Sequence, residues 1–423
     1  GTYYDLGSMS DDQRTYLRSN GFLFQKPRPT SLLYHSGAAR SWPDDRGIFH
    51  NKDETALAWC NEEDHCRIIS MSKDGDVKAV FARFCALSHA IKASVEADGG
   101  KFMFSETLGF LGTCPSNLGT GLRASVMIKL PELNKNVHLL EEICGNLDLQ
   151  PRGSAGEYSA AVGGKWDISN KQRIGFSEAE LVQKMVNGVT KLIAIEEAFA
   201  AGKSVEEVKT AFADIFAAGE PGRIDASNPK NTDEFKYRVY DTLPRMVQTS
   251  QGGKYKSLMS RYLTQDLFDK LKDKQTSKGY TLSNVIQTGV MTPHLGNGLT
   301  AGDEESWDVF AELFNPIIKA WHGFDPEKEK HRSDLNPDNV TQTDDQLKKF
   351  NEYVVSTRIR AARNISGFAL PAGATVADRH GVAETLQKAF ARFEGDLAGT
   401  YYDLGSMSDD QRTYLRSNGF LFQ

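Results

Sequence analysis

The sequence lacks several features that would place it in large functional classes. Its 423 residues contain no apolar run near the roughly 18 residues that a membrane-spanning helix needs, so we expect no membrane association. Only five cysteines are present, none forms a CxxC pair, and residue 1 is not followed by a secretory leader; we therefore expect reduced thiols and a cytoplasmic protein. The net charge of -6 excludes a general attraction to nucleic acid.

Two site signatures are also missing. The sequence has no GxxxxGK[ST] string, the glycine-rich loop that cradles phosphates in many nucleotide-binding proteins. It has no HExxH motif and no Cys/His cluster at metal-ligand spacing, which argues against a zinc site made by protein side chains. We expect any anion to be held by locally clustered cations, and any metal to arrive together with a nucleotide.

The chain repeats its own beginning. Residues 399–423 are identical to residues 1–25, an offset of 398 residues that chance does not produce. This identity indicates a window cut from a tandem array of near-identical modules. The alternative is an engineered circular permutant, which we disfavour because the connection from Lys203 to Gly253 is not built of glycine and serine.

The apolar pattern predicts mixed secondary structure over the first 200 residues. Helical spacing over 76–99 ends at a pair of glycines, and Ser177 with Glu180 forms a capping box ahead of a second apolar helix that ends at Gly202. Short apolar or alternating runs at 55–60, 66–72 and 122–130, bounded by turn residues, predict strands.

The remainder divides into three parts. A helical pattern at 204–218 leads into a polar loop at 219–233, helical spacing runs from 257 to 323, strand-type residues occupy 353–360, and a helix is predicted at 383–393. We therefore predict a catalytic α/β domain at 1–202, a linker at 203–252, a small helical domain at 253–345, and the start of a further catalytic domain at 346–423.

One sequence motif points to a particular protein family. Residues 114–120, CPSNLGT, resemble the signature of the phosphagen (guanidino) kinases, and NEEDH at 61–65, STRIR at 356–360, GLRAS at 121–125 and RG at 152–153 resemble further elements of that family. The resemblance covers nearly the whole chain. It implies an α+β fold, a small all-helical domain plus a larger domain with an antiparallel sheet flanked by helices, here in rotated (permuted) order.

The resemblance also implies a nucleotide site with ATP or ADP and Mg²⁺ as cofactors. Phosphoryl transfer spreads negative charge over oxygens that fixed guanidinium forks stabilise well, so arginines are the expected ligands. The alternative for any single arginine is a surface ion pair. The positions that match the family's nucleotide residues are Arg67, Arg123, Arg152, Arg358, Arg360 and Asp167.

The predicted catalytic residues are Glu63, Glu157 and Cys114. Glu63 matches the family's glutamate that takes a proton from the guanidinium and holds one nitrogen in line with the γ-phosphorus. Cys114 matches the reactive cysteine whose thiolate favours that cation, and the alternative is a buried structural thiol. Glu62 and Asp64 are expected to reach Mg²⁺ through water, unless the turn is simply a solvated acidic one.

The guanidine is inferred from two positions. The loop Met291–Thr300 is short and Glu157 is acidic, both as in arginine kinases, so we predict L-arginine, with creatine or taurocyamine as alternatives. The expected substrate contacts are Gly296, Asn297, Gly298 and Trp321. Three residues depart from the family pattern: Trp321 replaces a tyrosine or arginine, and Gly21 and Met127 each replace a histidine near the nucleotide.

Two functions from different classes remain at this point. The first is a tandem arginine kinase that buffers ATP; the second is a kinase-derived structural component of a cilium or flagellum with an axonemal partner, next to neighbouring modules of the array. The sequence leaves open whether residues 253–398 complete a site with residues 1–200 of the same chain or serve a following module.

Overall fold

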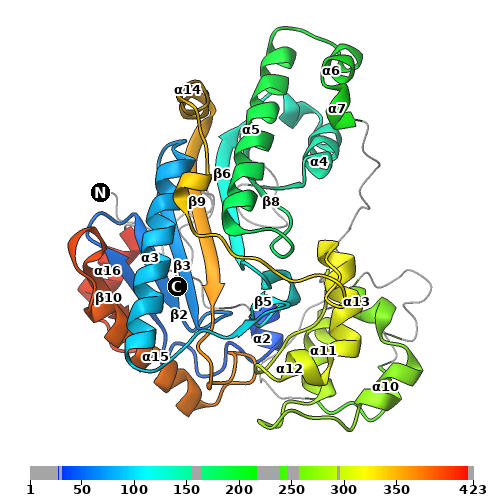
Figure 1. Ribbon diagram of the computed structural model, residues 1–423, viewed down its shortest axis with the longest axis vertical. Helices are drawn as coiled ribbons and strands as arrows, with labels where there is room; N and C mark the ends of the chain where they lie inside the picture. The colour runs from blue at the N-terminus through cyan, green and yellow to red at the C-terminus, as the bar shows by residue number, and fades with distance from the viewer. Residues whose placement is uncertain are drawn as a thin grey trace.

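The fold combines a large antiparallel sheet, covered by long helices, with a smaller group of short helices (Figure 1). The structure is a computed structural model, and it describes residues 27, 31–153, 163–216, 238–244, 247, 257–292 and 296–417. The α+β class and the two-part architecture are therefore confirmed. No helix in these ranges is both long and apolar enough to cross a bilayer.

Eight strands form the main sheet in the order β10-β1-β2-β3-β9-β6-β8-β7, and every neighbouring pair is antiparallel. The strands are β1 Gly47–Asn51, β2 Ala56–Cys60, β3 Cys66–Ser72, β6 Leu122–Lys129, β7 Leu149–Gly153, β8 Lys165–Asn170, β9 Val354–Arg363 and β10 Gly399–Asp403. A separate two-stranded sheet consists of β4 Phe104–Ser105 and β5 Gly109–Phe110. The strands predicted at 55–60, 66–72 and 122–130 are confirmed.

Strand β9 shows whether the last part of the chain joins the domain formed by its first part. It lies between β3 and β6, with Ile359 opposite Ser70 of β3 and opposite Ala124 of β6. A strand from the last quarter of the chain thus occupies the middle of a sheet whose other central strands come from the first half. Within this chain, residues 354–363 complete one sheet with residues 47–170.

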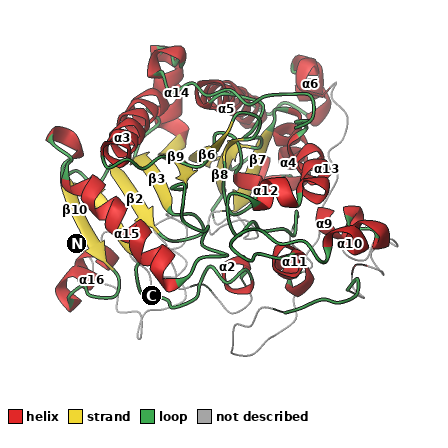
Figure 2. Ribbon diagram, turned by 60° about the horizontal axis from the view of Figure 1, so that its bottom comes forward, coloured by secondary structure: helices red, strands yellow, loops and turns green. Residues whose placement is uncertain are grey.

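Helices cover one face of this sheet and pack around its rim (Figure 2). Their bounds are α2 Leu32–His35, α3 Val77–Ala97, α4 Val137–Asn146, α5 Glu178–Ala200, α6 Val205–Ala211, α7 Ala213–Phe216, α14 Asp344–Tyr353, α15 Val376–Ala391 and α16 Asp409–Ser417. Helix α3 contacts β3 and β9, α5 contacts β6 and β8, and α4 contacts β7. The main hydrophobic core lies between these helices and the sheet.

The two long helices begin and end where the sequence predicts. The side chain of Asp76 accepts a hydrogen bond from the backbone N–H of Ala79 at the start of α3. At the start of α5, Ser177 and Glu180 form both bonds of the predicted capping box. Helix α15 begins at 376 rather than at the predicted 383, because Thr375 and Asp378 make a capping box that the apolar pattern alone did not reveal.

The smaller domain is helical but less continuous than predicted for 257–323. Its helices are α9 Leu258–Tyr262, α10 Gln265–Leu271, α11 Leu282–Met291, α12 Ser306–Val309 and α13 Ala311–His322, with non-helical residues at 272–281 and 296–305. Its core includes Leu111 and Leu118 from the large domain, so the two domains share apolar contacts.

The repeated stretch supplies an edge of the sheet. Residues 399–403 form β10, which pairs with β1, and α16 follows it. Leu404, Met407 and Leu415 are buried in a small cluster with Ile48 and Trp59 on the face opposite the main core. The identical residues 1–25 lie outside the described residues, as do 217–237 of the predicted linker.

Candidate active site

Arginines gather on the sheet face opposite the main helices. Side chains alternate between the two faces of a strand, and the apolar partners Ile68, Ala124 and Ile359 point into the main core. Their neighbours in sequence therefore share the other face: Arg67 on β3, Arg123 on β6, and Arg358 and Arg360 on β9. The register sets Arg360 directly opposite Arg123.

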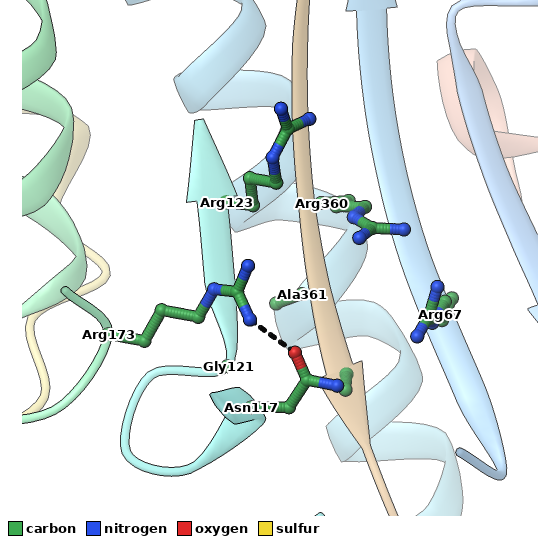
Figure 3. A pocket seen from close by; sticks show the side chains of 8 residues that line it. Arg67, Asn117, Gly121, Arg123, Arg173, Arg360 and Ala361 are labelled. Atoms are coloured by element: carbon green, nitrogen blue, oxygen red, sulfur yellow. Dashed lines mark hydrogen bonds between the residues drawn. The ribbon is translucent and has the colours of Figure 1, made fainter. Parts of the chain in front are cut away.

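Figure 3 shows three of these guanidinium groups, those of Arg67, Arg123 and Arg360, around one small pocket. Its lining includes Arg67, Arg123, Arg173 and Arg360, together with Asn117. Gly121, at φ 59°, and Ala361 and Ala362 form the backbone side of the pocket. Four cations on three neighbouring strands and one loop thus line one space, an arrangement that favours binding of an anion.

Mutual repulsion shows in the electrostatics of strand β9. Burial, and after it the charge of the neighbouring Arg123, lowers the pKa of Arg358 to about 10. Burial and then the charges of Arg67, Arg123 and Arg358 bring the pKa of Arg360 well below its usual range. A polyanion bound here would relieve both effects, because it stabilises the charged guanidinium.

Asp167 holds one of these arginines. Its Oδ2 accepts a hydrogen bond from Nη2 of Arg123 at 2.9 Å. Burial alone would raise the pKa of Asp167, but the Arg123 guanidinium outweighs it and the net pKa is lowered. On the sheet, Asp167 lies opposite both Arg152 of β7 and Met127 of β6, so these three predicted positions come together.

The acidic hairpin between β2 and β3 lies beside the arginines. Arg67 donates from Nη2 to Oε2 of Glu63 and from Nε to Oε2 of Glu62, the latter at 3.0 Å. Burial would lower the pKa of Arg67, but Glu62 and Glu63 reverse this and raise it. Arg67 therefore connects the predicted catalytic carboxylate to the arginine cluster.

Asp64 does not lie where the sequence suggested. Its side chain is fully buried, and its Oδ1 accepts hydrogen bonds from the backbone N–H of Thr113 at 2.9 Å and from Nδ2 of Asn364 at 3.0 Å. Burial raises its pKa. The expected contact of Asp64 with Mg²⁺ through water stays a prediction; in this structure its Oδ1 connects the hairpin to the residues that precede Cys114 and follow β9.

The signature loop meets the helical domain at Cys114. The Sγ atom accepts a hydrogen bond from Nδ2 of Asn297 at 3.2 Å and lies 3.0 Å from Oγ of Ser116. Burial, reinforced by the charge of Glu63, raises the pKa of the Cys114 thiol to about 11. A thiol with this pKa is protonated at pH 7 in the chain without substrate, so the thiolate role of Cys114 stays a prediction.

The predicted guanidine contacts are adjacent to one another. The ring of Trp321 lies so close to Gly296 that a Cβ at this glycine would fall 2.4 Å from it. Asn297 is buried, and its Oδ1 accepts a hydrogen bond from the backbone N–H of Leu299. Gly298 has a φ of 78°, which favours glycine. The predicted roles of Glu157 and Gly21 concern positions outside the described residues.

Two buried polar residues escaped the analysis of the sequence. Asn117 belongs to the short 3₁₀ helix η1 Pro115–Asn117, and its Nδ2 lies 3.4 Å from Oε2 of Glu63. Arg173, in the loop after β8, donates from Nη1 to Oδ1 of Asn117. The signature string contained Asn117, but nothing in the spacing of Arg173 indicated that it would reach this loop.

In the part of the chain that the structure describes, no group of three or more His, Cys, Asp or Glu side chains is arranged to hold a metal ion. Glu62 and Glu63 are the carboxylates on the hairpin that keep some exposure, 14% and 15% of their side chains. They are the residues that fit a contact with a metal delivered as part of a nucleotide complex.

Comparison with known proteins identifies the family of this chain. Residues 1–199 match the sequence profile described as "ATP:guanido phosphotransferase, C-terminal catalytic domain", and residues 253–319 match "ATP:guanido phosphotransferase, N-terminal domain". The chain belongs to the ATP:guanido phosphotransferase family. The two matched domains are in reverse order along the chain, as the rotated layout predicted.

Similar curated proteins act on different guanidines by name. The chain is 38% identical over its whole length to the flagellar creatine kinase of Strongylocentrotus purpuratus and to the arginine kinase of Anthopleura japonica, and 33% identical to the taurocyamine kinase of Schistosoma mansoni. These matches cover 34%, 53% and 52% of the relatives, so the chain spans about half their length or less.

Solved structures of the family are also similar. A lombricine kinase crystal structure matches 49% of this chain and 56% of its own, with 48% identity and a TM-score of 0.42. The duplicated taurocyamine kinase from Schistosoma mansoni matches the whole chain and 54% of its own, with 29% identity and a TM-score of 0.39.

Proposed function

We propose that this chain transfers the γ-phosphoryl group of MgATP reversibly to a guanidine nitrogen. The observation that carries the proposal is the position of Arg67, which contacts the carboxylate of Glu63 and at the same time lines the arginine pocket. A single side chain, that of Arg67, thus connects a pocket suited to bind phosphate with a carboxylate able to receive a proton.

The arginines would bind and polarise the phosphates. Arg123, Arg358 and Arg360 are fixed on neighbouring strands, so their guanidinium groups need little reorganisation when charge develops on the transferring oxygens. Mg²⁺ would enter as part of the substrate MgATP and neutralise further charge. The relief of repulsion among the arginines adds to the affinity for the nucleotide.

Glu63 would receive the proton that leaves the guanidinium. In this structure its Oε2 is engaged by Arg67. Phosphate oxygens of a bound nucleotide compete for that guanidinium, which would free the carboxylate to hold a guanidine nitrogen in line with the γ-phosphorus. Nucleotide binding thereby prepares the base for the second substrate.

We propose L-arginine as the guanidine. The short loop Met291–Thr300 leaves room for a guanidine larger than creatine, and Asn297 of this loop reaches Cys114 in the signature loop. The relatives named for creatine and taurocyamine make these the comparison substrates. The whole chain is the appropriate sample, because β9 completes the sheet within it.

The test measures ADP formation by the 423-residue chain with MgATP and arginine, creatine or taurocyamine. Glu63→Gln removes the base at constant size, and Glu96→Gln, an exposed residue on α3, is the matched control. We expect turnover with arginine that Glu63→Gln lowers by about 100-fold or more and Glu96→Gln leaves unchanged. A folded chain without turnover of any guanidine would refute the proposal.

The cellular setting is a separate proposal. The sea-urchin relative is named as a flagellar enzyme, and the internal repeat of 25 residues supports a place in a tandem array. We propose that the chain belongs to such an array in a cilium or flagellum, where it buffers ATP. Immunolocalisation in ciliated cells that shows no signal in cilia or flagella would contradict this location.

A further inference from the structure

Beside the arginine pocket, a hydrogen-bonded path joins the loop after β8 to the predicted base. Nη1 of Arg173 donates to Oδ1 of Asn117 and to the backbone oxygen of Ser116, both at 2.5 Å. Nδ2 of Asn117 donates to Oε2 of Glu63 at 3.4 Å. Arg173 and Asn117 are 7% and 8% exposed, so water competes little for these bonds.

The chemistry of the three groups allows one orientation of the amide. A guanidinium only donates hydrogen bonds and an ionised carboxylate only accepts them. The amide of Asn117 therefore satisfies both neighbours when its oxygen faces Arg173 and its nitrogen faces Glu63, as it does here. Figure 3 shows the bond between Arg173 and the amide oxygen. Turning the amide over would place its oxygen beside the carboxylate and its N–H₂ beside a cation.

The backbone fixes Arg173 at this place. Its carbonyl oxygen accepts hydrogen bonds from the N–H of Thr120 at 2.9 Å and from its Oγ1 at 2.8 Å. Gly119, at φ 78°, lets the two loops touch, because a Cβ there would lie 2.6 Å from that same carbonyl oxygen. The signature loop and the loop after β8 are thus bound together independently of any ligand.

We propose that Asn117 and Arg173 are positioning residues that hold the carboxylate of Glu63 in the geometry needed for proton acceptance, with Arg173 acting through Asn117. This inference rests on the proposed phosphoryl transfer and deepens it. Arg67 holds the same carboxylate oxygen from the other side. When a nucleotide draws Arg67 toward its phosphates, Asn117 is the contact that keeps Glu63 from following.

The inference predicts an effect on kcat rather than on nucleotide affinity. Asn117→Ser removes the bridge without adding charge, and Arg173→Lys keeps the charge but replaces the planar guanidinium whose Nη1 reaches both acceptors. We expect each variant to lower kcat by up to about 100-fold, the size of effect that a displacement of about 1 Å produces. The KM for MgATP should stay within about twofold.

A second readout does not depend on catalysis. In the NMR spectrum of the ¹⁵N-labelled full chain, the side-chain amide signal of Asn117, assigned by its loss in Asn117→Ser, should move in Arg173→Lys and in Glu63→Gln. Asn187→Ser, at an exposed position on α5, is the matched control and should leave both the signal and kcat unchanged. Thermal unfolding of each variant verifies that it is folded.

The outcomes separate the two proposals. A wild-type chain without turnover whose Asn117 signal still moves in both variants would refute the phosphoryl transfer and keep the hydrogen-bonded path. An Asn117 signal that does not move, or a kcat within about twofold of wild type in both variants, would overturn the positioning role. A common fall in kcat, nucleotide affinity and melting temperature would show a merely structural role, which also overturns it.

Discussion

The repeated stretch allows a sharp test, because Leu415 has an identical counterpart at Leu17. Leu415 is fully buried beneath the sheet edge, in the cluster with Ile48 and Trp59. Replacing such a leucine by alanine costs about 2–5 kcal/mol of unfolding free energy. The loss would be smaller if residues 1–25, which carry the same side chains, could take the place of residues 399–423.

Two hydrogen bonds favour residues 399–423 over residues 1–25 as the segment that packs at the sheet edge. The backbone N–H of Lys52 donates to the oxygen of Ala398 at 3.2 Å, and Nδ2 of Asn51 donates to the oxygen of Asp396 at 3.0 Å. Both acceptors precede the repeated stretch, so a sample of these 423 residues carries them only ahead of residues 399–423. At about 0.5–1.5 kcal/mol each, they favour it by about 1–3 kcal/mol.

This preference limits the unfolding free energy that Leu415→Ala can remove, because residues 1–25 could replace the altered segment. We expect Leu415→Ala to lower the unfolding free energy by about 1–3 kcal/mol, Leu17→Ala by less than about 0.5 kcal/mol, and the double substitution by about 2–5 kcal/mol. Urea unfolding followed by tryptophan fluorescence measures all three. Equal, small losses of unfolding free energy in the two single variants, with a large loss in the double variant, would refute the preference for residues 399–423. A larger loss in Leu17→Ala than in Leu415→Ala would show that residues 1–25 occupy the sheet edge instead.

Three further predictions concern single groups. Arg360→Lys should lower kcat/KM for MgATP by about 10- to 150-fold, the equivalent of a charge-assisted hydrogen bond of about 1.5–3 kcal/mol, whereas the exposed Arg392→Lys should have no effect in the same assay. Alkylation of Cys114 by iodoacetamide, followed by mass spectrometry, should accelerate with pH up to about 11, because burial raises the pKa of this thiol; a rate that is already maximal at pH 7 would contradict a neutral thiol. Burial lowers the pKa of His331 from 6.5 to about 4, so the unfolded chain binds the proton more strongly and stability should fall as the pH drops from about 6.5 to 4. His331→Gln should flatten this fall by up to about 1.4 kcal/mol per pH unit in urea titrations, and an unchanged slope would show that His331 is not its source.

Local sequence signals located the long helices and the four central strands of the main sheet, β2, β3, β9 and β6. The spacing of apolar residues in α3 and the capping box at Ser177 depend on residues a few positions apart, which a sequence displays directly. The same holds for the alternation that sets Arg123 and Arg360 on one sheet face. Family strings then identified these arginines as ligands, which periodicity alone does not do.

Long-range packing decided the parts that the sequence did not reveal. The burial of Asp64 depends on Asn364, 300 residues later, so an acidic turn that looks solvated in the sequence is enclosed in the fold. The protonation of Cys114 depends on burial beneath the helical domain. The contact between Arg173 and Asn117 depends on two loops that only the finished sheet brings together.

The place of β9 also determines when the sheet can form. Ile359 of β9 and its partner Ser70 of β3 are about 290 residues apart, so within these 423 residues the central ladder closes only when two distant segments meet. Until then β3 and β6 each present an unpaired edge, which is a template for wrong pairing. Because the centre of the sheet depends on such distant pairing, we expect a sample of these 423 residues to refold slowly after dilution from urea, with β3 and β6 open to wrong pairing during that time.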